Sequence, residues 1–102
     1  MQIKKGTRLR TKIESVFHAL EDRDYVPEID KKGKPIDPAD LYTFPPQVDF
    51  TIDRWELDFT EINNYRLIFI LENDEEFYYL VYQAKQREML VQMILGQFEV
   101  VN

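Results

Sequence analysis

The stretch NYRLIFILENDEEFYYLVYQ, residues 64–83, decides the fold. It contains two runs, residues 65–71 and 77–82, that are rich in aliphatic and aromatic side chains, and the pair Asn73-Asp74 between them is typical of a tight turn. The stretch therefore predicts two neighbouring antiparallel strands. Because both runs are apolar on nearly every residue, we expect other parts of the protein to cover both of their faces.

The preceding run VDFTIDRWELDFT, residues 48–60, predicts a third strand. Its apolar residues fall on even positions up to Ile52 and on odd positions from Trp55 onward. A slip of one residue turns every later side chain to the opposite face, so the change at Asp53-Arg54 needs a bulge or a turn. Neither residue is Gly or Asn, and we therefore predict a bulge in one long bent strand.

The sequence predicts one helix before these strands and one after them. Between Arg8 and Asp22, apolar residues recur every three or four positions on a single helical stripe: Leu9, Ile13, Val16, Phe17 and Leu20. Residues 84–95 predict a second helix that Gly96 ends as a left-handed cap, and residues 98–101 predict a short final strand. The expected fold class is α+β: a three-stranded antiparallel meander with a bent first strand, packed with an N-terminal and a C-terminal helix.

The chain has 102 residues, which suits a single domain with one core. Residues 23–47 contain all five prolines and predict a long, ordered, irregular connection within that domain. The lack of cysteine excludes disulfides and thiolate metal sites. No apolar run is long enough to span a membrane and no secretory leader follows the basic start, so we expect a cytoplasmic protein.

Acidic residues dominate the body of the chain. The formal net charge is −6, but residues 1–12 hold five basic residues and no acid, whereas residues 13–83 hold 17 acidic and 6 basic residues. Such a body repels phosphate backbones, which disfavours direct binding of nucleic acid. This charge instead favours a protein partner with a basic surface.

One candidate binding face consists of four carboxylates along the predicted first strand: Asp49, Asp53, Glu56 and Asp58. An acidic face of this kind can occupy a basic patch of another protein, with complementary charge setting rate and specificity. The same residues can also serve only to keep an apolar sheet soluble. The sequence leaves both interpretations open.

The sequence shows little catalytic equipment. His18 is the only histidine, and it is placed on the solvent side of the first predicted helix. The three glycines are isolated, so there is no glycine-rich phosphate loop. We therefore expect no catalytic residue, no metal and no cofactor, and we predict a non-enzymatic protein-binding module of the adaptor, inhibitor or immunity type.

An enzymatic alternative follows from the predicted order helix, three strands, helix, with Gln83 and Lys85 at the end of the third strand. This order resembles the core of the restriction-endonuclease-like nucleases. The resemblance implies a metal-dependent nuclease in which Asp58 or Glu61 holds the metal and Lys85 helps to activate water. Gln83 then stands where the family usually has an acid, and Glu14 is a further metal ligand.

The apolar residues of the second predicted helix spread over more than half of its circumference, which one sheet face cannot cover. Either residues 23–47 fold over the surplus apolar surface, or another subunit does. We expect self-association as a homodimer through this helix and the predicted last strand, with Met89 and Met93 in the contact.

Overall fold

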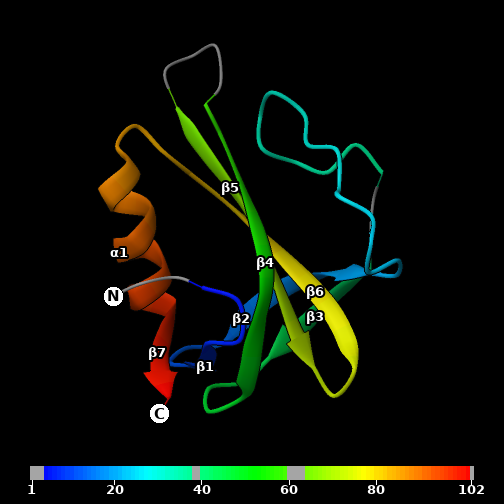
Figure 1. Ribbon diagram of the computed structural model, residues 1–102, viewed down its shortest axis with the longest axis vertical. Coiled ribbons are helices and arrows are strands. Elements are labelled where there is room, and N and C mark those ends of the chain that lie inside the picture. The colour runs from blue at the N-terminus through cyan, green and yellow to red at the C-terminus, as the bar shows by residue number, and fades with distance from the viewer. Residues whose placement is uncertain (1–3, 38–39, 60–63, 102) are drawn as a thin grey trace.

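The computed structural model describes residues 4–37, 40–59 and 64–101. Within these residues the chain forms seven strands and one helix, in the order β1 (Arg8–Thr11), β2 (Ser15–Leu20), β3 (Leu41–Phe44), β4 (Asp49–Phe59), β5 (Tyr65–Asn73), β6 (Glu76–Ala84), α1 (Arg87–Gln97) and β7 (Phe98–Val101). All strand pairs are antiparallel, and the sheet order is β3-β2-β6-β5-β4-β1-β7. The predicted α+β meander of three strands with two helices is wrong, because the described chain is mostly β (Figure 1).

The sheet curls into a half-barrel (Figure 1). Neighbouring strands lie about 4.8 Å apart, so a flat sheet would separate β2 from β7 by roughly 24 Å. The rings of Phe17 on β2 and Phe98 on β7 instead have centroids 6.1 Å apart. Phe50 of β4 lies 4.8 Å from Phe17 and 5.1 Å from Phe44 of β3, again between ring centroids. These rings form the centre of the core on the concave side of the sheet.

The stretch at residues 64–83 folds into neighbouring antiparallel strands, β5 and β6, as predicted. Asp74 and Glu75 have positive φ angles of 50° and 68°, which gives a two-residue turn whose twist matches that of the flanking strands. The expected cover on both faces is confirmed. Alternate residues enter two separate cores: Leu67, Phe69, Leu71, Tyr78, Leu80 and Tyr82 on the concave side, and Ile68, Ile70 and Tyr79 on the convex side.

β4 is one long strand with a bulge at Asp53, as predicted. The register with β5 shifts between Ile52 and Arg54. Phe50 and Ile52 before the bulge and Leu57 beyond it all contact the concave core. The extra residue therefore keeps the apolar side chains of both halves of β4 on the same face.

The predicted N-terminal helix is wrong, because residues 8–20 form β1, a tight connection and β2. Thr11 and Phe17 are fully buried, whereas Ile13 and Val16 are about half exposed. A helix would have buried Ile13 and Val16 on the same stripe as Phe17. The helical spacing is a coincidence, and the pairing of β1 with β4 and β7, and of β2 with β3 and β6, decides the local structure.

The predicted second helix exists as α1, but with different bounds. Ala84 belongs to β6, and the helix starts at Arg87. Gly96 is not a left-handed cap, because the helix continues to Gln97 and the backbone then enters β7 in an extended conformation. Burial of Phe98 in the concave core and pairing of β7 with β1 draw the chain out of the helix. The predicted short final strand is confirmed.

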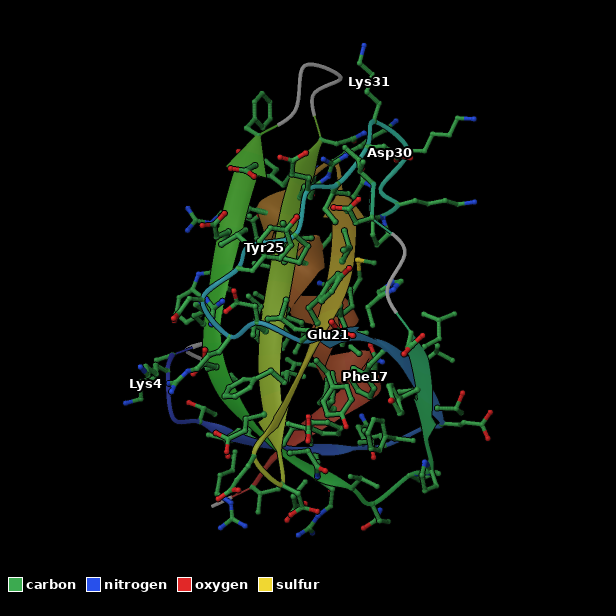
Figure 2. The ribbon with its side chains drawn as sticks, turned by 90° about the vertical axis from the view of Figure 1, so that its right-hand side faces the viewer. Lys4, Phe17, Glu21, Tyr25, Asp30 and Lys31 are labelled. Carbon is green, nitrogen blue, oxygen red and sulfur yellow. The ribbon has the colours of Figure 1, made fainter. Side chains whose placement is uncertain are left out.

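Residues 21–37, here called the covering segment, lie over the convex face of the sheet, opposite α1 (Figure 2). Val26 and Ile29 of this segment pack against the buried residues of that face, Leu20, Ile68, Ile70 and Tyr79. The prediction of an irregular connection over residues 23–47 needs a correction, because β3 lies within it. The covering segment and α1 together enclose the central hairpin from its two sides.

Candidate functional site

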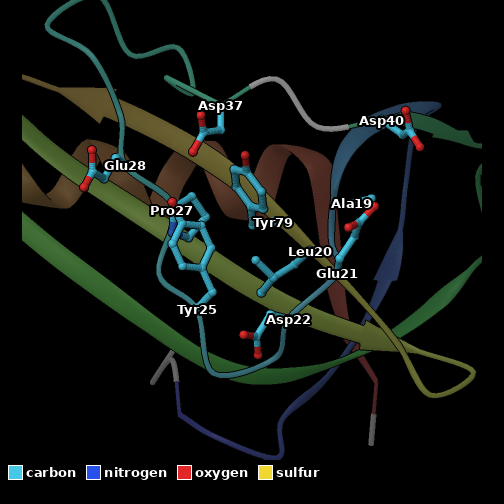
Figure 3. A pocket seen from close by; sticks show the side chains of 10 residues that line it. All are labelled: Ala19, Leu20, Glu21, Asp22, Tyr25, Pro27, Glu28, Asp37, Asp40 and Tyr79. Atoms are coloured by element: carbon cyan, nitrogen blue, oxygen red, sulfur yellow. The ribbon is translucent and has the colours of Figure 1, made fainter.

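A pocket of about 300 Å³ lies on the convex face, between the end of β2 and the covering segment (Figure 3). Its lining comes from β2, β6, the covering segment and the residue before β3: Ala19, Leu20, Glu21, Asp22, Tyr25, Pro27, Glu28, Asp37, Asp40 and Tyr79. Five of these residues are carboxylates and none is basic. This combination makes the pocket the candidate site.

The floor of the pocket is apolar and aromatic. Tyr79 and Leu20 are 2% and 6% exposed, and both belong to the convex core. The imidazole of His18 stacks on the Tyr79 ring, with centroids 4.9 Å apart and planes inclined by 20°. Because His18 and Tyr79 are directly paired across β2 and β6, the sheet fixes the orientation of this ring.

The Tyr79 hydroxyl is the polar group of the floor. The side chain is almost completely buried, yet no hydrogen bond joins its hydroxyl to another group in the described part of the chain. Burial raises the pKa of Tyr79 above its ordinary value, so the hydroxyl is protonated at neutral pH and can both donate and accept. Figure 3 shows the hydroxyl end of the ring on the side where Asp37 lies.

Two arginines of the sheet hold the wall of the pocket in place. Arg54 on β4 donates hydrogen bonds to the backbone carbonyls of Arg23 and Tyr25. Arg66 on β5 donates to the backbone carbonyl of Asp30 at 2.6 Å. A guanidinium presents several donors in a rigid plane, so each arginine fixes a stretch of the covering segment against the convex face.

Two aspartates shape the covering segment locally. Asp22 accepts a hydrogen bond from the backbone N–H of Asp24, directly after β2 ends. Asp30 accepts from the backbone N–H groups of Lys32 and Lys34, and the contact with Lys34 is the main cause of the lowered pKa of Asp30. Aspartates form such turns because their short side chains reach backbone groups a few residues further on. These turns direct the segment back across the sheet.

The carboxylates of the pocket are spread around its rim. All five belong to exposed residues: Glu21, Asp22, Glu28, Asp37 and Asp40. Among residues 4–37, 40–59 and 64–101, no three side chains of His, Cys, Asp or Glu are close enough together to hold a metal ion. The pocket therefore presents a broad negative field around an aromatic floor, which suits an extended organic cation.

The acidic face predicted on β4 does not present four free carboxylates. Asp49 accepts a hydrogen bond from Arg10 at 2.7 Å, which lowers the pKa of Asp49. Asp53 is buried and pairs with Arg23 at 3.2 Å and with Arg54 at 2.6 Å. The two predicted residues that stay exposed are Glu56 and Asp58.

The residues of the nuclease hypothesis are placed apart from one another. Asp58, Arg66 and Gln83 lie in one row across β4, β5 and β6, so Arg66 stands between the two predicted site residues. The Gln83 side chain lies against Gly33 in the covering segment, where an added Cβ would clash with it. Lys85 is exposed just beyond the end of β6.

Two residues of that hypothesis, Glu61 and Glu14, remain. Glu61 lies outside the described residues. Glu14 is exposed in the connection between β1 and β2. The first helix that the resemblance requires is replaced by these two strands, so the resemblance does not extend to the fold.

Met89 and Met93 lie on the outer side of α1 and are 44% and 42% exposed. Leu90 and Ile94 of the same helix are buried in the concave core. The helix thus keeps an apolar strip in solvent, and self-association through it stays a prediction.

The pocket was missed in the sequence because most of its residues fall either in the wrongly predicted first helix or in the connection predicted to be irregular, and Tyr79 joins them only in the fold. Glu21 and Asp22 precede the proline-rich connection, whereas Asp40 comes near its end. The signal in the sequence that could have indicated the pocket was the series of carboxylates just before and within residues 23–47. Tyr79 gave no separate signal, because in the sequence it is one aromatic among several in β6.

No protein-family model, curated protein or solved structure matches this chain. In the part of the chain that the structure describes, no helix has the length and apolar character needed to cross a membrane. The role of the pocket must therefore be inferred from its residues and geometry.

Proposed function

We propose that the protein is a non-enzymatic binding module that recognises a basic segment of another protein. The observation that supports this function is the pocket on the convex face, where five carboxylates surround an aromatic floor and no basic side chain takes part in the lining. The pocket replaces the β4 face as the proposed contact, because Asp49 and Asp53 on β4 are already paired with arginines.

A protein partner fits the charge better than a nucleic acid does. The net charge of −6 and the acidic rim repel phosphate groups but attract Lys and Arg side chains. Complementary charge of this kind speeds encounter and selects the partner, while desolvated contacts at the centre supply most of the affinity. The aromatic floor offers such a centre.

The binding function can be tested with a labelled, capped peptide of alternating arginine and glycine residues, measured by fluorescence anisotropy. We expect saturable binding of one peptide per protein, with an affinity that falls as the salt concentration rises. Charge reversal at the rim, Glu21→Lys with Glu28→Lys, is expected to abolish the binding, because these two carboxylates line the pocket.

The matched control is the pair Glu56→Lys and Asp58→Lys, which changes the net charge by the same amount at exposed positions of β4. We expect this pair to weaken binding only slightly, through the long-range field. Thermal unfolding of each variant establishes that both remain folded. Equal losses in the two pairs, or no binding by the unaltered protein, would refute the proposed function.

A further inference from the structure

We infer that the pocket takes the side chain of a single arginine, with Tyr79 at its floor as the hydrogen-bonding group and Tyr25 as the ring that the guanidinium contacts. This inference rests on the proposed function, since the arginine would belong to the basic segment of the partner. It adds the identity of the recognised group and the residues that read it.

The unpaired hydroxyl of Tyr79 is the observation that points to a ligand. A hydroxyl that faces a pocket without a protein partner can accept a hydrogen bond from a group that enters the pocket. The Tyr79 side chain is 2% exposed and lines the pocket, and within the described residues its hydroxyl has no partner. Its oxygen is open to solvent in the pocket, since the buried side-chain atom without a partner among the described residues is Nε of Arg66. A donor that enters the pocket can therefore reach the Tyr79 oxygen.

The Tyr79 ring is held ready for such a contact. His18 stacks on it from β2 with a centroid distance of 4.9 Å, and the ring belongs to the convex core together with Leu20 and Ile70. A ring fixed in this way loses little conformational entropy when a ligand binds.

The size of the pocket fits one side chain. A volume of about 300 Å³ is at the lower end of the range for ligand sites. The mouth carries the ring of Tyr25, which is 42% exposed and comes from the covering segment, whereas Tyr79 comes from β6 (Figure 3). A cation on a long aliphatic stem can pass between these elements and contact both rings.

The distribution of charge favours arginine over lysine. The rim carboxylates do not converge on one point, because among the described residues no three such side chains lie close enough together to hold a metal ion. An ammonium group is a compact, strongly hydrated charge, whereas a guanidinium is planar, weakly hydrated and carries five N–H donors in fixed directions. A guanidinium can therefore reach separated acceptors, such as the Tyr79 hydroxyl and a rim carboxylate, at the same time.

The test is a titration of the ¹⁵N-labelled protein, followed by NMR, with Nα-acetyl-arginine methylamide and with its lysine and citrulline counterparts. We expect the arginine compound to shift the amide signals of the lining residues, from β2, the covering segment and Tyr79. The lysine compound should bind more weakly, and the citrulline compound, which is isosteric but uncharged, should not bind.

Two conservative variants separate the pocket from the rest of β6. Tyr79→Phe removes only the hydroxyl and is expected to weaken arginine binding roughly three- to tenfold. Tyr78→Phe is the matched control, because Tyr78 is the neighbouring residue of the same strand but faces the concave core. This control should bind the arginine compound as the unaltered protein does.

The outcomes distinguish this inference from the proposed function. Equal binding of arginine and citrulline, or an unchanged affinity in Tyr79→Phe, overturns the arginine site, and binding of the arginine-glycine peptide would still support the proposed function. If the arginine compound binds in the pocket but the peptide does not, the site recognises a free guanidinium compound and the proposed protein partner is refuted.

Discussion

At the scale of single residues, Asp53 connects two distant parts of the chain. It lies at the bulge of β4 with 7% of its side chain exposed, and it pairs with Arg23 of the covering segment and with Arg54 of its own strand. Arg54 also donates to the backbone carbonyl of Tyr25 at 3.2 Å. The bulge therefore creates the place where the sheet holds the wall of the pocket.

Replacing Asp53 with Asn tests this role. The substitution leaves two guanidinium groups without their anion, and we expect the free energy of unfolding to fall by about 1–3 kcal/mol. This loss is smaller than for a fully buried ion pair, because solvent screens the largely exposed Arg23. Asp58→Asn, at an exposed position of the same strand, should change it by less than about 0.5 kcal/mol. Urea unfolding of both variants measures the difference, and similar effects would contradict a structural role of Asp53.

A second prediction concerns the protonation of His18. Burial lowers the pKa of His18 below its ordinary value of 6.5, so the unfolded chain binds the proton more tightly than the folded protein does. The contribution of His18 to the free energy of unfolding is fully present above pH 6.5. It is lost as the pH falls from 6.5 through the lowered pKa of His18 in the folded protein. The loss is small because His18 is only partly buried.

His18→Phe keeps a ring against Tyr79 but removes the titration. We expect the stability of this variant to change less than that of the unaltered protein between about pH 7 and about pH 5.5. Urea unfolding at several pH values within this window gives the comparison. Identical pH dependence in the two proteins would show that His18 contributes nothing to it.

At the scale of elements, β2 serves both the core and the pocket. Phe17 points to the concave side, where its ring meets those of Phe44, Phe50 and Phe98. Its neighbour His18 lies on the convex side against Tyr79. The alternation of a strand makes this double use possible, because successive side chains point to opposite faces.

This alternation predicts unequal effects of two adjacent substitutions. Phe17→Ala removes a fully buried ring and is expected to lower the free energy of unfolding by about 3–5 kcal/mol. Val16→Ala, at a residue that is 50% exposed, should cost less than about 0.5 kcal/mol beyond its effect on strand propensity. A helix would bury both side chains on one stripe, so comparable losses in denaturant unfolding would contradict the assignment of β2 as a strand.

The elements that could be predicted from the sequence are those with local signals. The central hairpin carries its own turn at Asn73-Asp74, and the bulge at Asp53 shows as a change of parity within one run. β1 and β2 could not be predicted, because their partners lie far along the chain and their spacing imitates a helix. β3 was hidden for a similar reason, since it follows three of the five prolines, in sequence typical of turns, and pairs back with β2.

The candidate site was harder to predict than the sheet. Its carboxylates surround one pocket only because the covering segment turns back over β6, and that path depends on Arg54 and Arg66 beneath it. In the sequence, Asp49 and Asp53 seem as available as any other acid, and only the fold reveals that arginines neutralise them. Charge composition thus underlies the type of partner that we propose, whereas tertiary pairing decides which carboxylates are free to bind it.

At the scale of the whole molecule, the protein has a convex side with the acidic pocket and a concave side closed by α1. The outer strip of α1 exposes Met89 and Met93, and Val100 on the neighbouring strand β7 is 39% exposed. β7 is also an edge strand of the sheet, and edge strands and apolar strips are the surfaces through which copies of a protein associate.

The predicted homodimer can be tested by sedimentation velocity over a range of protein concentrations. If α1 mediates it, we expect a dimer that becomes more abundant as the concentration rises and that Met89→Lys with Met93→Lys abolishes. Ile13→Lys with Val16→Lys is the control, because these residues are also exposed and apolar but lie in and before β2. A monomer at every concentration would refute the prediction.

The ladder between β1 and β7 has a consequence for how the protein reaches its structure. Arg8 pairs with Val101 and Thr11 with Phe98, so nearly all of the described chain lies between the two strands. Contacts this remote in sequence must overcome a large loop-closure entropy before they contribute, and proteins rich in them fold slowly, in milliseconds to seconds. The central hairpin can assemble early from nearby residues, and joining the two remote strands is then the slow step that completes the half-barrel.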